Sequence, residues 1–232
     1  MRFFRRRKND PPDPRTAWPS PEVPEDPGQA AVAFWRRWFE LLPRINGALG
    51  DREPQRVEHE LCEAIARVHP ELHFSLERGQ RAIYALVVTG QESPELRPFT
   101  DAWIAAAPEE DAIWEYHDSV PGVPDPNEVT VNLGEHRIAL AEVRVAAQID
   151  ETEAVVDVAV HHPRLSSLED AARSAMTFLP LDATLGERLA AERLRRVETA
   201  EIEPAGSISL LELRDLVRKL AERKPQDVGG TD

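Results

Sequence analysis

The sequence has little cysteine, little lysine and no long apolar run. Its single cysteine, Cys62, excludes an intramolecular disulfide framework and any zinc site built from several cysteines. No stretch approaches the roughly 18 apolar residues that a membrane-spanning helix needs, and no apolar segment of a secretory signal follows the first basic residues. We therefore predict a cytoplasmic protein in a reducing compartment, with Cys62 acting as a small apolar group.

Motifs of common enzyme classes are also missing. The sequence contains no G-x-x-x-x-G-K-[ST] loop, no G-x-G-x-x-G loop and no G-x-S-x-G turn. Its seven histidines have no cysteine partner and form no H-x-x-x-H pair within a predicted helix, so we predict no zinc site. These absences weaken the usual nucleotide-binding and hydrolase interpretations, and we predict no cofactor.

The charge of the chain is strongly acidic, with a formal value of −14. Such a charge excludes non-specific attraction to nucleic acid for the body of the protein and favours basic proteins or peptides as partners. Five cations nevertheless gather in residues 1–8, beside Phe3 and Phe4. This basic end is either a solvated tail or makes weak contact with an anionic membrane surface.

The densest apolar stretch is F-W-R-R-W-F at residues 34–39. At 100° per residue its aromatic side chains, Phe39 included, fall with Leu41, Leu42 and Ile45 within an arc of about 160°. This pattern predicts an amphipathic helix from about Gln29 to Gly47 that packs on a sheet. We expect strands from both later halves of the chain to bury it.

The order of the predicted elements indicates an α+β fold. Residues 1–27 are predicted to be a disordered basic and proline-rich tail, 28–224 a globular domain and 225–232 a second disordered tail. Residues 72–117 and 142–202 share the order strand, turn, strand, serine-capped helix, strand, and the proline-containing connection 119–127 separates them. We interpret them as a diverged internal duplication, two ββαβ halves forming a mixed or antiparallel sheet covered by amphipathic helices.

Local signals place the boundaries of several elements. The first half should contain strands at 72–77, 81–89 and 112–117, and the second half strands at 142–149, 154–161 and 194–202. Ser166 or Ser167 should cap a helix that Pro180 ends or kinks. Ser209 and Glu212 fit a capping box at the start of the last helix.

Two short motifs carry a resemblance to a known family. The aromatic helix, together with a later L-D-A-T-L-G-E segment, resembles a family of uncharacterised bacterial proteins with an F-W-x-W-F opening helix and a late L-D-x-x-L-G-E segment. The resemblance implies a similar element order over most of residues 30–220 and no particular activity. The matching residues are Phe34, Trp35, Trp38, Phe39, Leu181, Asp182, Leu185, Gly186 and Glu187.

Four residues are candidates for a binding site. His161 and His162 lie at the predicted end of a strand, where alternation sends their rings to opposite faces, so they cannot both bind one metal ion there. One of them could act as a base in a cleft, or both could have only packing roles. Asp182 and Glu187 could present oxygens to a cation or a basic partner; alternatively, Asp182 caps a turn in which Gly186 has a positive φ.

These features lead to three functional hypotheses. The first is a non-catalytic cytoplasmic binding protein, whose acidic surface and a cleft between its two halves receive a basic protein or peptide. The second is an enzyme of unrecognised type that uses a strand-end histidine with nearby carboxylates. The third is a regulator held at a membrane surface by residues 1–8. The sequence leaves the oligomeric state open.

Overall fold

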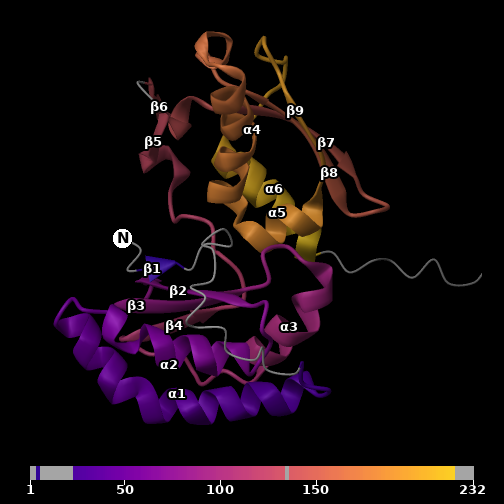
Figure 1. Ribbon diagram of the computed structural model, residues 1–232. Helices are drawn as coiled ribbons and strands as arrows, with labels where there is room; N and C mark the ends of the chain where they lie inside the picture. Colours follow the sequence, from indigo (N-terminus) through magenta and orange to yellow (C-terminus); the bar gives the residue numbers. More distant parts are fainter. Residues whose placement is uncertain (1–3, 6–22, 134–135, 223–232) are drawn as a thin grey trace, which may run out of the picture. The chain divides into compact units, whose positions relative to one another are not determined.

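The computed structural model describes residues 4–5, 23–133 and 136–222 (Figure 1). The chain forms two compact units, residues 1–120 and 121–232, whose boundary falls within the predicted connection 119–127. Helices and strands are both present in each unit, so the predicted α+β class is confirmed. The predicted tails lie mostly outside the described residues. Among the described residues, no helix combines the length and hydrophobicity needed to span a membrane.

The first unit is rich in helix. Helix α1 begins after Asp26, whose carboxylate accepts the backbone N–H groups of Gly28 and Gln29, and Pro27 supplies the fixed φ that suits a first turn. It packs against both of the longer helices that follow. The bounds are α1 Pro27–Gly50, α2 Gln55–Ala66, the short 3-10 helix η1 Pro94–Leu96, and α3 Arg97–Ala105.

The sheet of the first unit has the strand order β1-β2-β3-β4. β2 and β3 form the predicted antiparallel hairpin, and β4 lies parallel to β3 after a crossover through α3. The predicted strand positions are confirmed to within a few residues. The bounds are β1 Phe4–Arg5, β2 His73–Arg78, β3 Tyr84–Thr89 and β4 Trp114–His117.

The aromatic helix is buried on this sheet, as predicted. Trp38 is fully buried, and the indole N–H of Trp35 donates to the carbonyl of Trp103 at 2.7 Å, which satisfies a polar group inside the core. The prediction for Phe39 is wrong, because its side chain is 55% exposed. At 100° per residue Phe39 lies about 140° from Phe34, at the edge of the apolar stripe and away from its buried centre.

The second unit contains two small sheets. β5 and β6 form an antiparallel pair, while β7 and β8 form the predicted second hairpin and β9 lies parallel to β8. β9 is shorter than the predicted 194–202. The bounds are β5 Thr130–Leu133, β6 His136–Ala139, β7 Arg144–Asp150, β8 Val155–His161 and β9 Leu194–Thr199.

Three of the predicted helix boundaries lie in the second unit. The capping box is confirmed, because Ser209 and Glu212 exchange backbone and side-chain hydrogen bonds at the start of α6. The serine cap is wrong: Ser167 lies in a separate 3-10 turn, and α4 starts after Glu169. Pro180 does not end α4. The bounds are η2 Pro126–Glu128, η3 Leu140–Glu142, η4 Leu165–Ser167, α4 Asp170–Leu185, α5 Glu187–Arg193 and α6 Leu210–Glu222.

Each unit has a hydrophobic core of its own. The cluster around the aromatic helix draws its residues from the first unit alone, and the second cluster draws on residues 129–220. The expectation that strands of both halves bury the aromatic helix is therefore wrong. The strand pairing β2-β3-β4 repeats in β7-β8-β9, but α1 and α2 precede the first set and α6 follows the second. The internal duplication stays a prediction.

Candidate functional site

The face of the first sheet opposite the aromatic core is polar. In β4, Trp114 and Tyr116 belong to the core, so alternation directs Glu115 and His117 to the other face. The register places Glu115 beside Ala85 and His117 beside Val87 of β3. This face therefore combines small apolar side chains of the central strand with an acid and an imidazole.

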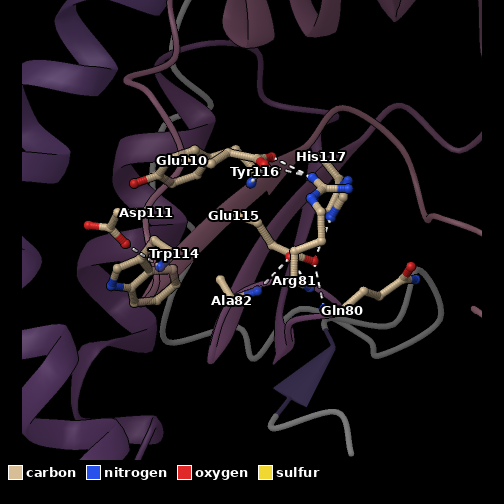
Figure 2. Close-up of polar contacts among 9 residues, drawn as sticks. All are labelled: Gln80, Arg81, Ala82, Glu110, Asp111, Trp114, Glu115, Tyr116 and His117. Carbon is tan, nitrogen blue, oxygen red and sulfur yellow. Dashed lines mark hydrogen bonds and ion pairs between the residues drawn. The ribbon is translucent and has the colours of Figure 1, made fainter.

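Glu115 is a fully buried carboxylate with four hydrogen-bond donors (Figure 2). Its Oε1 accepts the N–H of Gln80 at 2.8 Å, and its Oε2 accepts those of Arg81 at 2.7 Å and Ala82 at 3.0 Å. The Nε2 of His117 lies 3.0 Å from Oε1. Burial alone would raise the pKa of Glu115, but these hydrogen bonds outweigh it and lower the pKa to about 2. The carboxylate is therefore ionised at every physiological pH.

The loop 79–83, between β2 and β3, is shaped by this carboxylate. The backbone N–H groups of three successive residues, 80–82, donate to one anion, and these bonds hold the loop in place. Gly79 is required at the start, because a Cβ there would lie 2.5 Å from the carbonyl oxygen of Ala82. The loop is thus held in one shape by Gly79 and Glu115.

A second loop, residues 107–113, is fixed in a similar way. The Oδ1 of Asp111 accepts the N–H groups of Ile113 and Trp114, both at 2.7 Å, and the Asp111 N–H donates to the Trp114 carbonyl at 3.0 Å. The guanidinium of Arg81 donates to both carboxylate oxygens of Glu110, at 2.8 and 2.7 Å (Figure 2). This ion pair joins the two loops.

The pairing of β3 with β4 continues into both loops. The N–H of Ile83 donates to the carbonyl of Ala112 at 3.1 Å, and that of Tyr84 donates to the carbonyl of Ile113 at 2.8 Å. Ile83 and Ile113 thus occupy neighbouring positions at the ends of two paired strands. Their side chains are 57% and 42% exposed. The locked loops therefore present two isoleucines to solvent.

His117 is a strand-end histidine oriented by a carboxylate. Because a carboxylate can only accept, the imidazole Nε2 must carry the proton, and Nδ1 is left as the acceptor in the neutral ring. Such a pair can orient a general base. The nearest serine in this row, Ser75, is separated from His117 by Val87 and donates to Glu77 at 2.7 Å, so no Ser–His pair forms here.

The predicted histidines lie at the end of β8 and just beyond it. The Nδ1 of His161 lies 3.0 Å from the carbonyl oxygen of Ala200, and the Nδ1 of His162 accepts the N–H of Arg164 at 3.0 Å. The Nε2 of His162 lies 3.4 Å from the carboxylate of Glu142. Burial lowers the pKa of His162, which is almost inaccessible to solvent. Both rings are thus engaged in local structural contacts.

The predicted acids lie at helix ends. Asp182 is exposed in the last turn of α4, where its backbone carbonyl accepts the N–H of Gly186, and Glu187 is the first residue of α5. Gly186 has φ of 80°, which confirms the predicted positive φ. The contacts of His161 and His162 described above are with Ala200, Arg164 and Glu142. Among the described residues, no group of three or more His, Cys, Asp or Glu side chains could hold a metal ion.

The second unit has its own buried charge, Arg214 on α6. Its guanidinium donates to the carbonyl of Thr184 at 2.8 Å, of Pro124 at 2.7 Å and of Val123 at 2.6 Å. Burial lowers the pKa of Arg214, yet three carbonyl acceptors stabilise its charged form. Arg214 therefore connects α6, the end of α4 and the segment after the unit boundary.

Sequence reasoning missed the roles of Glu115 and Arg214. One signal for Glu115 was present: W-E-Y-H alternates large aromatic and ionisable residues along a predicted strand, which indicates a polar second face. No local signal marks its three backbone donors, which lie more than thirty residues earlier in the chain.

Comparison of the chain with protein-family models, curated proteins and solved structures found no match. The class of protein is defined here by fold and site alone. It is an α+β protein of two units, one of which presents exposed isoleucines on two loops locked by carboxylates. The resemblance to the bacterial family stays a prediction.

Proposed function

We propose that this protein is a non-catalytic binding protein that receives basic proteins or peptides on its acidic surface. Acidic residues outnumber basic ones in both parts of the chain, by 21 to 15 in residues 1–120 and by 21 to 13 in residues 121–232. A net negative charge on each unit attracts cationic partners and speeds their association. Acidic partners and nucleic acids are repelled by the same charge.

The observation that carries this proposal is that the buried charged side chains already have structural hydrogen-bond partners. Among the residues that the structure describes, Glu115 and Arg214 are the most buried acid and base, and each is hydrogen-bonded mainly to backbone groups of its own unit. Their contacts are those of structural residues, since a catalytic acid or base needs a free position toward its substrate. The ionisable groups that remain for partners are mainly exposed acids.

Binding of peptides of opposite charge tests the proposal. We expect an arginine-rich peptide to bind the full chain in a fluorescence anisotropy titration, and an acidic peptide of equal length not to bind. The affinity should fall at least tenfold between about 0.05 M and about 0.3 M salt, because salt screens exposed charges. An unrelated acidic protein of similar net charge is the control. Equal binding by that protein, or no binding at low salt, contradicts the proposal.

The second candidate function is an enzyme, and the Glu115–His117 pair is the observation that favours it. His117 is a strand-end histidine with a nearby carboxylate, although it is not one of the two predicted histidines. This candidate requires the ring proton of His117 to lie on Nε2, which faces Glu115, so that Nδ1 can accept a proton. Nitrogen NMR chemical shifts of the ring report the tautomer, and a proton on Nδ1 would exclude Nδ1 as the base.

A further inference from the structure

We infer that Ile83 and Ile113, with the acidic side chains of Glu109 and Asp111 beside them, form the docking surface for a basic peptide segment that carries an apolar side chain. We call these four residues the isoleucine surface. The inference rests on the proposed function and assigns it a place on the molecule. All four residues are exposed and belong to the first unit.

The apolar part of the surface is defined by adjacency as well as exposure. A single exposed isoleucine is common on soluble proteins, whereas apolar side chains that gather at one place mark interaction sites. Ile83 and Ile113 are brought to neighbouring positions by the backbone bonds of Ile83 to Ala112 and of Tyr84 to Ile113. Between them they offer a partner two branched side chains that are 57% and 42% exposed.

The surface is rigid before any partner arrives. Glu115 fixes the backbone up to Ala82, the residue before the first isoleucine, and Asp111 accepts the N–H of the second. The ion pair of Arg81 with Glu110 holds the two loops together. A partner therefore does not have to order these loops when it binds, which lowers the entropic cost of association.

The charge around the isoleucines selects a basic occupant. Glu109, Glu110 and Asp111 are consecutive and exposed, and Arg81 forms its ion pair with Glu110. Arg78, at the end of β2 just before the first loop, is in register with Tyr84, so alternation places it on the opposite face of the sheet. The rim is therefore negative. An arginine or lysine adjacent to an apolar residue would pair with these carboxylates while the apolar side chain covers the isoleucines.

A second copy of the chain is a less favourable occupant than a basic segment. Two identical surfaces meeting about a twofold axis would bring the same acids together, and the whole chain carries a formal charge of −14. Like charges across such an interface oppose association.

The test uses two peptides and the full-length chain. One peptide is arginine-rich with a single central leucine, and the other has serine in place of that leucine. We expect the unmodified chain to bind the leucine peptide about tenfold more tightly, which corresponds to about 1.4 kcal/mol. The double variant Ile83→Ser, Ile113→Ser should lose this difference. Ile149→Ser, at an isoleucine that is also 42% exposed but lies in the second unit, is the matched control and should keep it.

The outcomes separate the two proposals. If neither peptide binds the unmodified chain, the proposed function fails. If both bind and the double variant retains the leucine preference, the function stands and the isoleucine surface is wrong. NMR amide shifts during titration of the unmodified chain give a second measurement, in which changes confined to residues 80–83 and 109–113 support the surface and changes elsewhere overturn it. A concentration-dependent dimer that the double variant abolishes would also overturn it, in favour of a second copy.

Discussion

At the scale of the residue, the buried carboxylate of Glu115 shows how a charge can be stable inside this protein. Leaving an ion without partners in a buried place costs several kcal/mol, but four donors compensate Glu115. The donors belong to the neighbouring loop and to a histidine two residues away. The charge is therefore a structural element that sets the shape of the loop.

Replacing Glu115 by glutamine should destabilise the protein by roughly 3 kcal/mol at neutral pH. The estimate follows from the fall of the pKa from 4.5 to about 2, since each unit corresponds to about 1.4 kcal/mol. Because the folded-state pKa is the lower one, this stability is present above pH 4.5 and is lost as the pH falls toward 2. Urea denaturation at pH 7 and pH 3 measures the difference between the two proteins, which should shrink at the lower pH.

Glu109→Gln is the matched control for that substitution. Glu109 is an exposed acid on the neighbouring loop, and its replacement should change the free energy of unfolding by less than about 0.5 kcal/mol. A loss as large as that of Glu115→Gln would show that net charge, and not the hydrogen bonds of one carboxylate, determines the result.

At the scale of the element, Arg214 links α6 to two other segments of the second unit by hydrogen bonds. The guanidinium reaches the carbonyl of Thr184 near the C-terminal end of α4, where the helix dipole favours a cation. Its other two donors hold the segment that follows the unit boundary. One planar side chain thus positions three segments.

Arg214→Leu should lower the free energy of unfolding by roughly 3 kcal/mol. It leaves the buried carbonyl of Thr184 and the part-buried carbonyls of Pro124 and Val123 without their donor, and each such loss costs about 1 kcal/mol. Chemical denaturation measures the effect. Arg218→Leu, four residues later on the same helix and exposed, should be nearly neutral. Arg214→Lys should lie between the two, because an ammonium group cannot reproduce the planar fork.

Local sequence signals correctly predicted the features that depend only on residues close together in the chain. The capping box at Ser209 and the positive φ of Gly186 were found because each depends on neighbouring residues. The prediction that Pro180 ends or kinks its helix is wrong as to the end, because α4 continues past Pro180 and buries Leu181 and Leu185, and this burial offsets the cost of a missing N–H. The partners of Glu115 could not be predicted, since they come from a loop distant in sequence.

At the scale of the whole molecule, the chain has two cores. Periodicity predicted the aromatic helix and the repeated strand order, but it carries no information on which sheet covers which helix. For that reason we predicted one shared core from the sequence, whereas the buried residues form two separate clusters. Each cluster is built from its own helices and strands.

Truncating one core should affect mainly its own unit. Leu213→Ala in the second core should cost about 3 kcal/mol, because it leaves a cavity at a fully buried position, and should reduce amide hydrogen-exchange protection in residues 121–222. Leu61→Ala, at an equally buried position of the first core, is the reciprocal variant. Equal loss of protection in both units from either substitution would show that they unfold as one cooperative body.

The location of the aromatic residues has a practical consequence. All five tryptophans and both tyrosines precede residue 120, so the intrinsic ultraviolet emission of this protein originates in the first unit. Circular dichroism, in contrast, reports the helices of both units. A melting curve recorded by emission can therefore differ from one recorded by dichroism, and a gap between the two midpoints would give the order in which the units melt without any label.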